Sequence, residues 1–211
     1  MSRASDFFTQ RPTRRRTVAV VAPLAVGLAV AAGYGARLLQ VELDHDEPAT
    51  APALCWDGTQ LDAVDTCPLP AGEVGLAWVF PSFLPEELTC IDELVAHPEY
   101  DRPVMWTCTV LADGQAVDVT YSQVTGETAA RRFFDNLHGE DVRQVVPDSS
   151  GVGQQYLWRP DAADSAGRWE LSVLVQDYPY AVTVAAPTEA SLIDAYREVE
   201  IRPADEITQR P

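Results

Sequence analysis

Four cysteines, Cys55, Cys67, Cys90 and Cys108, are the residues of this 211-residue chain whose types and spacing most directly suggest chemistry. The first two close the stretch CWDGTQLDAVDTC, which also holds a tryptophan and three aspartates. Such a loop is compatible with a metal site, a redox pair or a structural disulfide. An even number of cysteines favours two disulfides wherever the chain reaches an oxidising compartment.

Metal sites need convergent ligands, and the spacing of the candidate ligands does not provide them. The cysteines lie 12, 23 and 18 residues apart without a C-x-x-C pair, and there is no H-E-x-x-H motif. His45, His97 and His138 fall in three unrelated segments, and the loop aspartates lack the rhythm of a calcium loop. We therefore expect no metal and no cofactor, and we interpret the aspartates as solvated turn residues.

Catalytic motifs are equally scarce in the sequence. There is no G-x-S-x-G elbow, and SSGVGQQ, 149–155, lacks the lysine of a phosphate-binding loop. The chain contains no lysine at all, which excludes Schiff-base chemistry on a lysine. We predict a non-enzymatic protein. The alternative is an enzyme whose site is assembled from scattered residues.

The N-terminal region indicates where the chain resides. Residues 17–36, TVAVVAPLAVGLAVAAGYGA, carry no charge over a length that spans a bilayer as a helix. The preceding 16 residues hold five arginines against one aspartate, so the positive-inside rule leaves residues 1–16 in the cytoplasm as a basic tail and exports the rest. The alternative is signal cleavage near Ala31, which would release a secreted chain.

The exported part is strongly acidic and divides into two regions. Residues 37–54 read as a flexible acidic stalk, and 55–211 as the folded domain. From residue 37 onward, 10 arginines face 31 acids, a net charge of −21. That charge disfavours nucleic acid and anionic surfaces as partners. Export also makes two disulfides the expected state of the cysteines.

The chain from 104 to 122 predicts a β-hairpin around Asp113-Gly114, a dipeptide suited to a two-residue turn. The register pairs Val110 with Val117, Cys108 with Val119 and Trp106 with Tyr121, so one face is apolar and the other polar. A second hairpin follows from RWELSVLVQ and PYAVTVAA, joined by a four-residue loop, and QQYLW adds a fifth strand.

Three helices are expected to cover one face of this sheet. Apolar spacing predicts helices over 126–138 and over the tail after a Thr188 cap, and a shorter one from Pro85 to about His97 that carries Cys90. A helix lying on the hairpin would bring Cys90 to Cys108, so we prefer the pairing 90–108 with 55–67 among the three possible. The predicted fold is α+β: a two-layer domain with five or more antiparallel strands, two or three helices on one face, and two disulfides.

The segment GLAWVFPSFLP, 75–85, concentrates aromatic residues beside prolines. Together with Trp56, the side chains of Trp78, Phe80 and Phe83 form a candidate binding surface, since aromatic residues dominate many recognition sites. The alternative is a further strand that places Leu76, Trp78 and Phe80 on one buried face.

The series CWDG, TCPLP and GLAWVFPSF resembles uncharacterised membrane-anchored extracytoplasmic domains of high-GC Gram-positive bacteria. More distantly, it resembles the extracellular sensor parts of single-pass bacterial Ser/Thr kinases. The resemblance covers roughly 55 to 122 and carries no catalytic residue. We therefore expect a single-pass, membrane-anchored module that binds a small ligand or another envelope protein; the further alternative is a structural subunit of a membrane complex.

Overall fold

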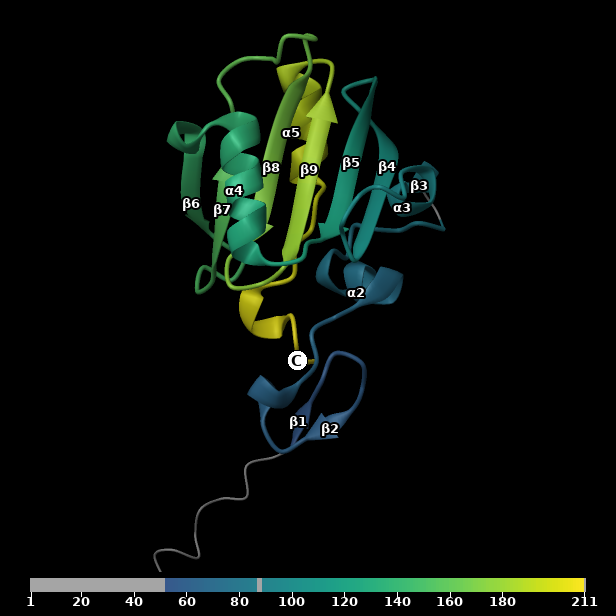
Figure 1. Ribbon diagram of the computed structural model, residues 1–211, viewed down its shortest axis with the longest axis vertical. Coiled ribbons are helices and arrows are strands. Elements are labelled where there is room, and N and C mark those ends of the chain that lie inside the picture. The colour runs from purple at the N-terminus through teal and green to yellow at the C-terminus, as the bar shows by residue number, and fades with distance from the viewer. Residues whose placement is uncertain (1–51, 87–88, 211) are drawn as a thin grey trace, which may run out of the picture. The chain divides into compact units, whose positions relative to one another are not determined.

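The computed structural model describes residues 52–86 and 89–210 (Figure 1). The predicted basic tail, membrane helix and most of the stalk, through residue 51, lie outside these residues. Within the described ranges, no helix has both the length and the apolar character needed to cross a membrane. The fold is α+β, with a seven-stranded sheet and few helices.

Every neighbouring pair in the main sheet is antiparallel, and the strand order is β3-β4-β5-β9-β8-β7-β6 (Figure 1). The strands are β3 Thr89–Asp92, β4 Val104–Ala112, β5 Gln115–Gln123, β6 Arg143–Pro147, β7 Gln154–Trp158, β8 Trp169–Val175 and β9 Tyr180–Ala186. All five predicted strands are present. The strands β3 and β6, which form the two edges, were not predicted.

Both predicted hairpin registers are confirmed. In the first, Trp106 pairs with Tyr121 and Cys108 with Val119, and Asp113 has the positive φ that the two-residue turn requires. In the second, Leu171 pairs with Val184 and Val173 with Val182. The alternation of apolar and polar residues set these registers, because a shift by one residue would have turned the apolar side chains to the other face.

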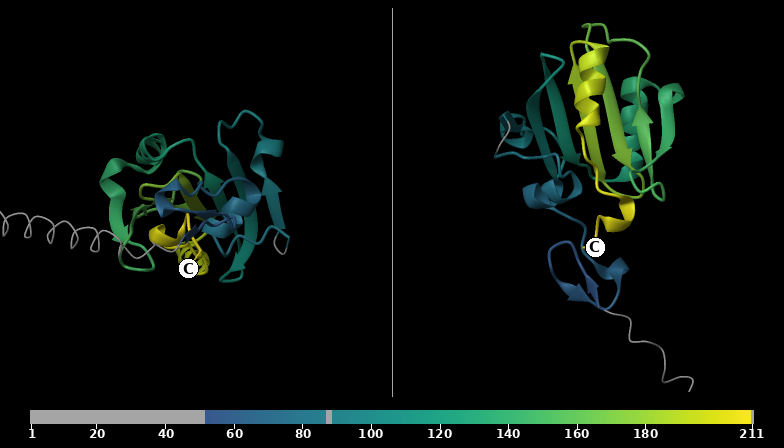
Figure 2. Two further views of the ribbon diagram at one scale, coloured as in Figure 1. Left: turned by 90° about the horizontal axis from the view of Figure 1, so that it is seen from below. Right: turned by 180° about the vertical axis from the view of Figure 1, so that it is seen from behind.

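The prediction that helices cover only one face was wrong. Helix α5 Glu189–Arg197 packs on one face and α4 Glu127–His138 on the other, as Figures 1 and 2 show. Helix α2 Gly72–Val79 lies at the ends of β4 and β5 (Figure 1), and its buried side chains join the core under α5. The reason lies in β8, whose residues are buried from Leu171 to Val175 on both sides. A central strand with apolar residues on both faces needs cover on both. Thr188 caps α5 as expected.

The expected helix from Pro85 to His97 is largely absent. Cys90 lies in the edge strand β3, opposite Cys108 of β4, and only a short helix, α3 Glu93–Ala96, follows. The apolar spacing was misleading because Ile91 and Val95 are 57% and 80% exposed and face no core. The disulfide between Cys90 and Cys108 is present, but it joins two neighbouring strands across a Cα–Cα distance of 4.0 Å.

The strand expected at Leu76, Trp78 and Phe80 is instead the helix α2. Leu76, Val79, Phe80 and Phe83 recur at the helical spacing i, i+3, i+4 and i+7, and all four are buried in the main core. Before α2, the chain forms the small pair β1 Ala53–Leu54 and β2 Gln60–Leu61, closed by the disulfide between Cys55 and Cys67.

The C-terminal tail runs beside this small pair. The Arg210 amide donates to the Leu54 carbonyl at 2.8 Å, and the Trp56 amide donates to the Thr208 carbonyl at 3.0 Å. Three short 3-10 turns complete the described chain, η1 Val64–Thr66, η2 Glu140–Val142 and η3 Ala204–Glu206. The first and last described segments therefore hold each other in place.

Candidate functional site

A cavity of about 370 Å³ lies between α5 and the β4–β5 hairpin, on the face of the sheet that α5 covers. We name it the α5 groove. Its apolar side chains come from three segments far apart in sequence: Val110 and Val119 from the hairpin, Leu84 from the chain after α2, and Ala195 and Val199 from α5 and the turn that follows it. The hairpin register places Val110 and Val119 on this face.

Hydrogen bonds that converge on the Ser82 hydroxyl join three of the segments that line the groove. The Tyr121 hydroxyl lies 3.2 Å from Ser82 Oγ, and the Glu200 amide donates to the same Oγ at 3.0 Å. Burial raises the pKa of Tyr121, so its hydroxyl stays protonated at neutral pH. Strand β5, the segment after α2 and the segment after α5 are thus tied at one point.

The apolar lining continues beyond the α5 groove. Leu84, 44% exposed, also lines a second cavity of about 290 Å³ with Val74, Ala77 and Phe83. Val74 on α2 is 74% exposed. Leu84 lines both cavities, and together with Val74 it connects them into one partly exposed apolar track.

Acidic side chains border this track. Asp194, Glu198 and Glu200 line the α5 groove, and Glu73 and Glu86 line the second cavity. All five are exposed, none forms an ion pair with a described residue, and no described arginine lines either cavity.

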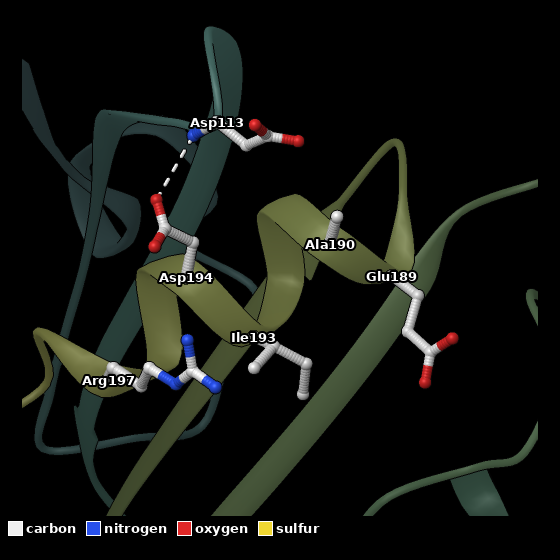
Figure 3. Close-up of a pocket in the computed structure, with 6 residues that line it drawn as sticks. All are labelled: Asp113, Glu189, Ala190, Ile193, Asp194 and Arg197. Atoms are coloured by element: carbon white, nitrogen blue, oxygen red, sulfur yellow. Dashed lines mark hydrogen bonds between the residues drawn. The ribbon is translucent and has the colours of Figure 1, made fainter.

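The arginine of α5 belongs to a neighbouring cavity. Figure 3 shows Arg197 near Ile193, at the other end of the helix from Glu189, while Asp194 accepts a hydrogen bond from the Asp113 amide at 3.2 Å. Asp194 lines both this cavity and the α5 groove. The hydrogen bond attaches the tip of the β4–β5 hairpin to α5, so it holds one wall of the groove against the other.

The described residues that line the α5 groove include two hydroxyls, from Ser82 and Tyr121, and three carboxylates. Ser82 is the one hydroxyl beside Tyr121 among the described residues that line it, and no imidazole or thiol joins them. A serine nucleophile needs an adjacent base to take its proton. An apolar floor with an acidic border is suited to holding a ligand.

A second polar cluster lies on the opposite face, under α4. His138 Nε2 is 2.9 Å from Ser172 Oγ and 3.6 Å from Glu170 Oε1, and Ser172 also contacts Thr183 at 2.9 Å. Burial lowers the pKa of His138 and raises the pKa of Glu170. In a catalytic triad, the acid and the nucleophile bond to different ring nitrogens. Here both lie at the same nitrogen and Ser172 is fully buried, so the cluster is structural.

The structure does not bring the predicted aromatic residues onto one surface. Phe80 and Phe83 are 0% and 1% exposed, so the prediction of an exposed aromatic surface is corrected at these two positions. Trp78 is half-buried, its Nε1 donates to the Ile207 carbonyl at 2.7 Å, and the Arg202 guanidinium stacks over its ring at 3.8 Å. These residues fix α2 to the core and to the C-terminal segment.

Trp56 is half-buried in the disulfide-closed loop, and its Nε1 is buried without a hydrogen-bond partner in the described chain. Its carbonyl accepts a hydrogen bond from Arg210 Nε at 2.9 Å. Asp57 in the same loop accepts from the Thr59 amide and hydroxyl, which lower its pKa, as in an ordinary turn.

Sequence reasoning missed the residues of the α5 groove because they meet only in the tertiary structure. One signal was present: Asp194 and Glu198 are four residues apart and therefore share a face of the α5 helix and its end. The sequence did not show that this face adjoins an apolar hairpin.

No family model matches the chain, and no curated protein or solved structure is similar to it at the significance required. Within residues 52–86 and 89–210, no group of three His, Cys, Asp or Glu side chains is arranged to hold a metal ion.

Proposed function

We propose that this protein is a single-pass, membrane-anchored extracytoplasmic module that binds another envelope protein through the α5 groove, without catalysing a reaction. The observation that carries the proposal is the exposed apolar track that joins the α5 groove to the cavity beside α2 through Leu84. Burial of such a track against a partner is favourable in proportion to the apolar area removed from water.

Two further observations support this function. The disulfides Cys55–Cys67 and Cys90–Cys108 agree with an oxidising compartment outside the cytoplasm. The groove offers hydroxyls and carboxylates but lacks a nucleophile with an adjacent base in the part of the chain that the structure describes. The uncharged segment 17–36 supplies the anchor in this proposal.

A cross-linking pull-down from intact membranes tests the proposal. We expect the wild-type chain to recover a specific envelope protein. The variant Leu84→Glu should fail to recover it, because it places a charge in the apolar track. The matched control is Leu137→Glu, which changes a similarly exposed leucine on α4, on the other face of the sheet. Recovery of the same partner with Leu84→Glu would contradict the role of the groove. Turnover of an envelope substrate by the protein, without a specific partner, would contradict the non-enzymatic function.

A further inference from the structure

The charge distribution around the apolar track specifies the chemistry of the partner. We infer that the α5 groove binds a cationic, amphipathic peptide segment, in which arginine or lysine residues flank apolar side chains. This inference rests on the proposed binding function and adds the class of partner.

The apolar component follows from the floor of the groove. Val110, Val119 and Val199 line a cavity of about 370 Å³, and Leu84 extends it toward the exposed Val74 on α2. Apolar side chains that project from one face of a peptide fill such a track, as an amphipathic helix fills a groove.

The cationic component follows from the border. Glu198 and Glu200, which line the α5 groove, and Glu86, which lines the second cavity, are exposed carboxylates without an ion pair to any described residue. An acidic partner would meet like charges at both cavities, whereas a basic partner meets opposite charges. The net charge of −21 from residue 37 onward adds long-range attraction for the same sign of partner.

A second copy of this chain is a less suitable occupant because it carries the same negative charge. Its approach would place two strongly acidic surfaces in contact. This repulsion favours a basic partner over self-association.

Three fluorescent peptides test the inference with the full-length protein in non-ionic detergent. The first alternates arginine pairs with leucines, the second replaces its leucines by serine, and the third replaces its arginines by glutamate. We expect the first peptide to bind, the second to bind at least about tenfold more weakly, and the third not to bind. Binding of the first peptide should weaken as salt is added.

Charge reversal localises the binding. The double variant Glu198→Arg/Glu200→Arg should weaken binding of the first peptide by about tenfold, because two attractions become repulsions. The control Asp101→Arg/Asp161→Arg makes the same change of net charge at exposed positions outside the groove and should leave binding within about twofold.

Equal losses in both double variants would overturn the inference, because binding would then depend on overall charge and not on the groove. Binding of the acidic peptide, or self-association of the chain blocked by Glu198→Arg/Glu200→Arg, would also overturn it. If the pull-down captures a partner through Leu84 while the cationic peptide fails to bind, the proposed function stands and the inference about partner chemistry is wrong.

Discussion

The most densely hydrogen-bonded carboxylate among the described residues is Asp148, in the loop between β6 and β7. Its Oδ1 accepts bonds from Ser150, Gly151 and Gly153, and its Oδ2 accepts from the Ala204 amide at 3.0 Å. Burial raises the pKa of Asp148, but the hydrogen bonds together outweigh it and the pKa lies below its usual value. This residue therefore attaches the loop to the C-terminal segment.

Asp148→Ala should lower the free energy of unfolding by about 1–2 kcal/mol, because it leaves several amide donors without an acceptor. Chemical denaturation measures the change, and Asp161→Ala, at an exposed position, is the control. A loss no larger than that of the control would contradict the assigned role. The stabilisation by Asp148 is present above the unfolded-state pKa of 3.8 and is lost as the pH falls through the lower folded-state pKa.

His138 gives the fold a pH dependence of its own. Burial depresses its pKa below 6.5, so at higher pH the ring is neutral in both the folded and unfolded states. As the pH falls below 6.5, the unfolded chain takes up a proton first, and the free energy of unfolding decreases until the folded-state pKa is reached. We expect His138→Gln to remove this dependence in urea titrations at a series of pH values.

Glu170 changes the free energy of unfolding with pH in the opposite direction to His138. Burial raises its pKa above 4.5, so its protonation in the folded state stabilises the fold as the pH falls from that raised pKa toward 4.5. The His138 comparison is therefore made in a Glu170→Gln background. If the free energy of unfolding still decreases as the pH falls below 6.5 after His138→Gln, a group other than His138 causes that decrease.

At the scale of elements, the disulfides fix segments that hydrogen bonding alone holds weakly. Cys90–Cys108 attaches the four-residue edge strand β3 to β4, and Cys55–Cys67 closes the loop that directly follows the two-residue strand β1 and contains β2. Digestion of the non-reduced protein at aspartate and glutamate separates all four cysteines. We expect mass spectrometry to find 55 joined to 67 and 90 joined to 108, whereas free thiols or another pairing would contradict this.

Removal of the second disulfide should act mainly on one edge of the sheet. We expect Cys90→Ala/Cys108→Ala to lower the free energy of unfolding by roughly 3 kcal/mol and to speed amide hydrogen exchange in β3. Exchange in β8 and β9, at the centre of the sheet, should change least because these strands are paired on both sides. Uniformly faster exchange would contradict this local role.

The sequence predicted the elements whose local pattern agrees with their environment. The hairpins were predictable in register because Asp113-Gly114 fixed the turn and alternation fixed the faces. Helix α2 was not predictable, because its aromatic residues also fit the period of two that is typical of a strand. Strand β3 was not predictable either, because an exposed edge strand needs no alternation of buried side chains. The α5 groove depends on contacts between segments such as Leu84 and Val199, which no local pattern contains.

For the whole molecule, the proposed function requires that residues 17–36 remain attached as a membrane anchor. We expect the full-length chain to stay in the membrane fraction after an alkaline wash, with its N-terminal peptide intact. Leu24→Arg/Leu28→Arg should abolish retention, since each arginine costs about 3 kcal/mol at the centre of a membrane helix. A soluble chain that begins just after Ala31 would instead establish signal cleavage and secretion.

Site-specific photo-cross-linking in living cells tests whether the α5 groove is the surface that binds a partner. A photoreactive residue replaces Leu84, in the groove, or Leu137, on α4 of the opposite face. We predict a discrete cross-linked product with one partner from position 84 and none from position 137. A product from position 137 alone, or equal products from both positions, would contradict this role of the groove.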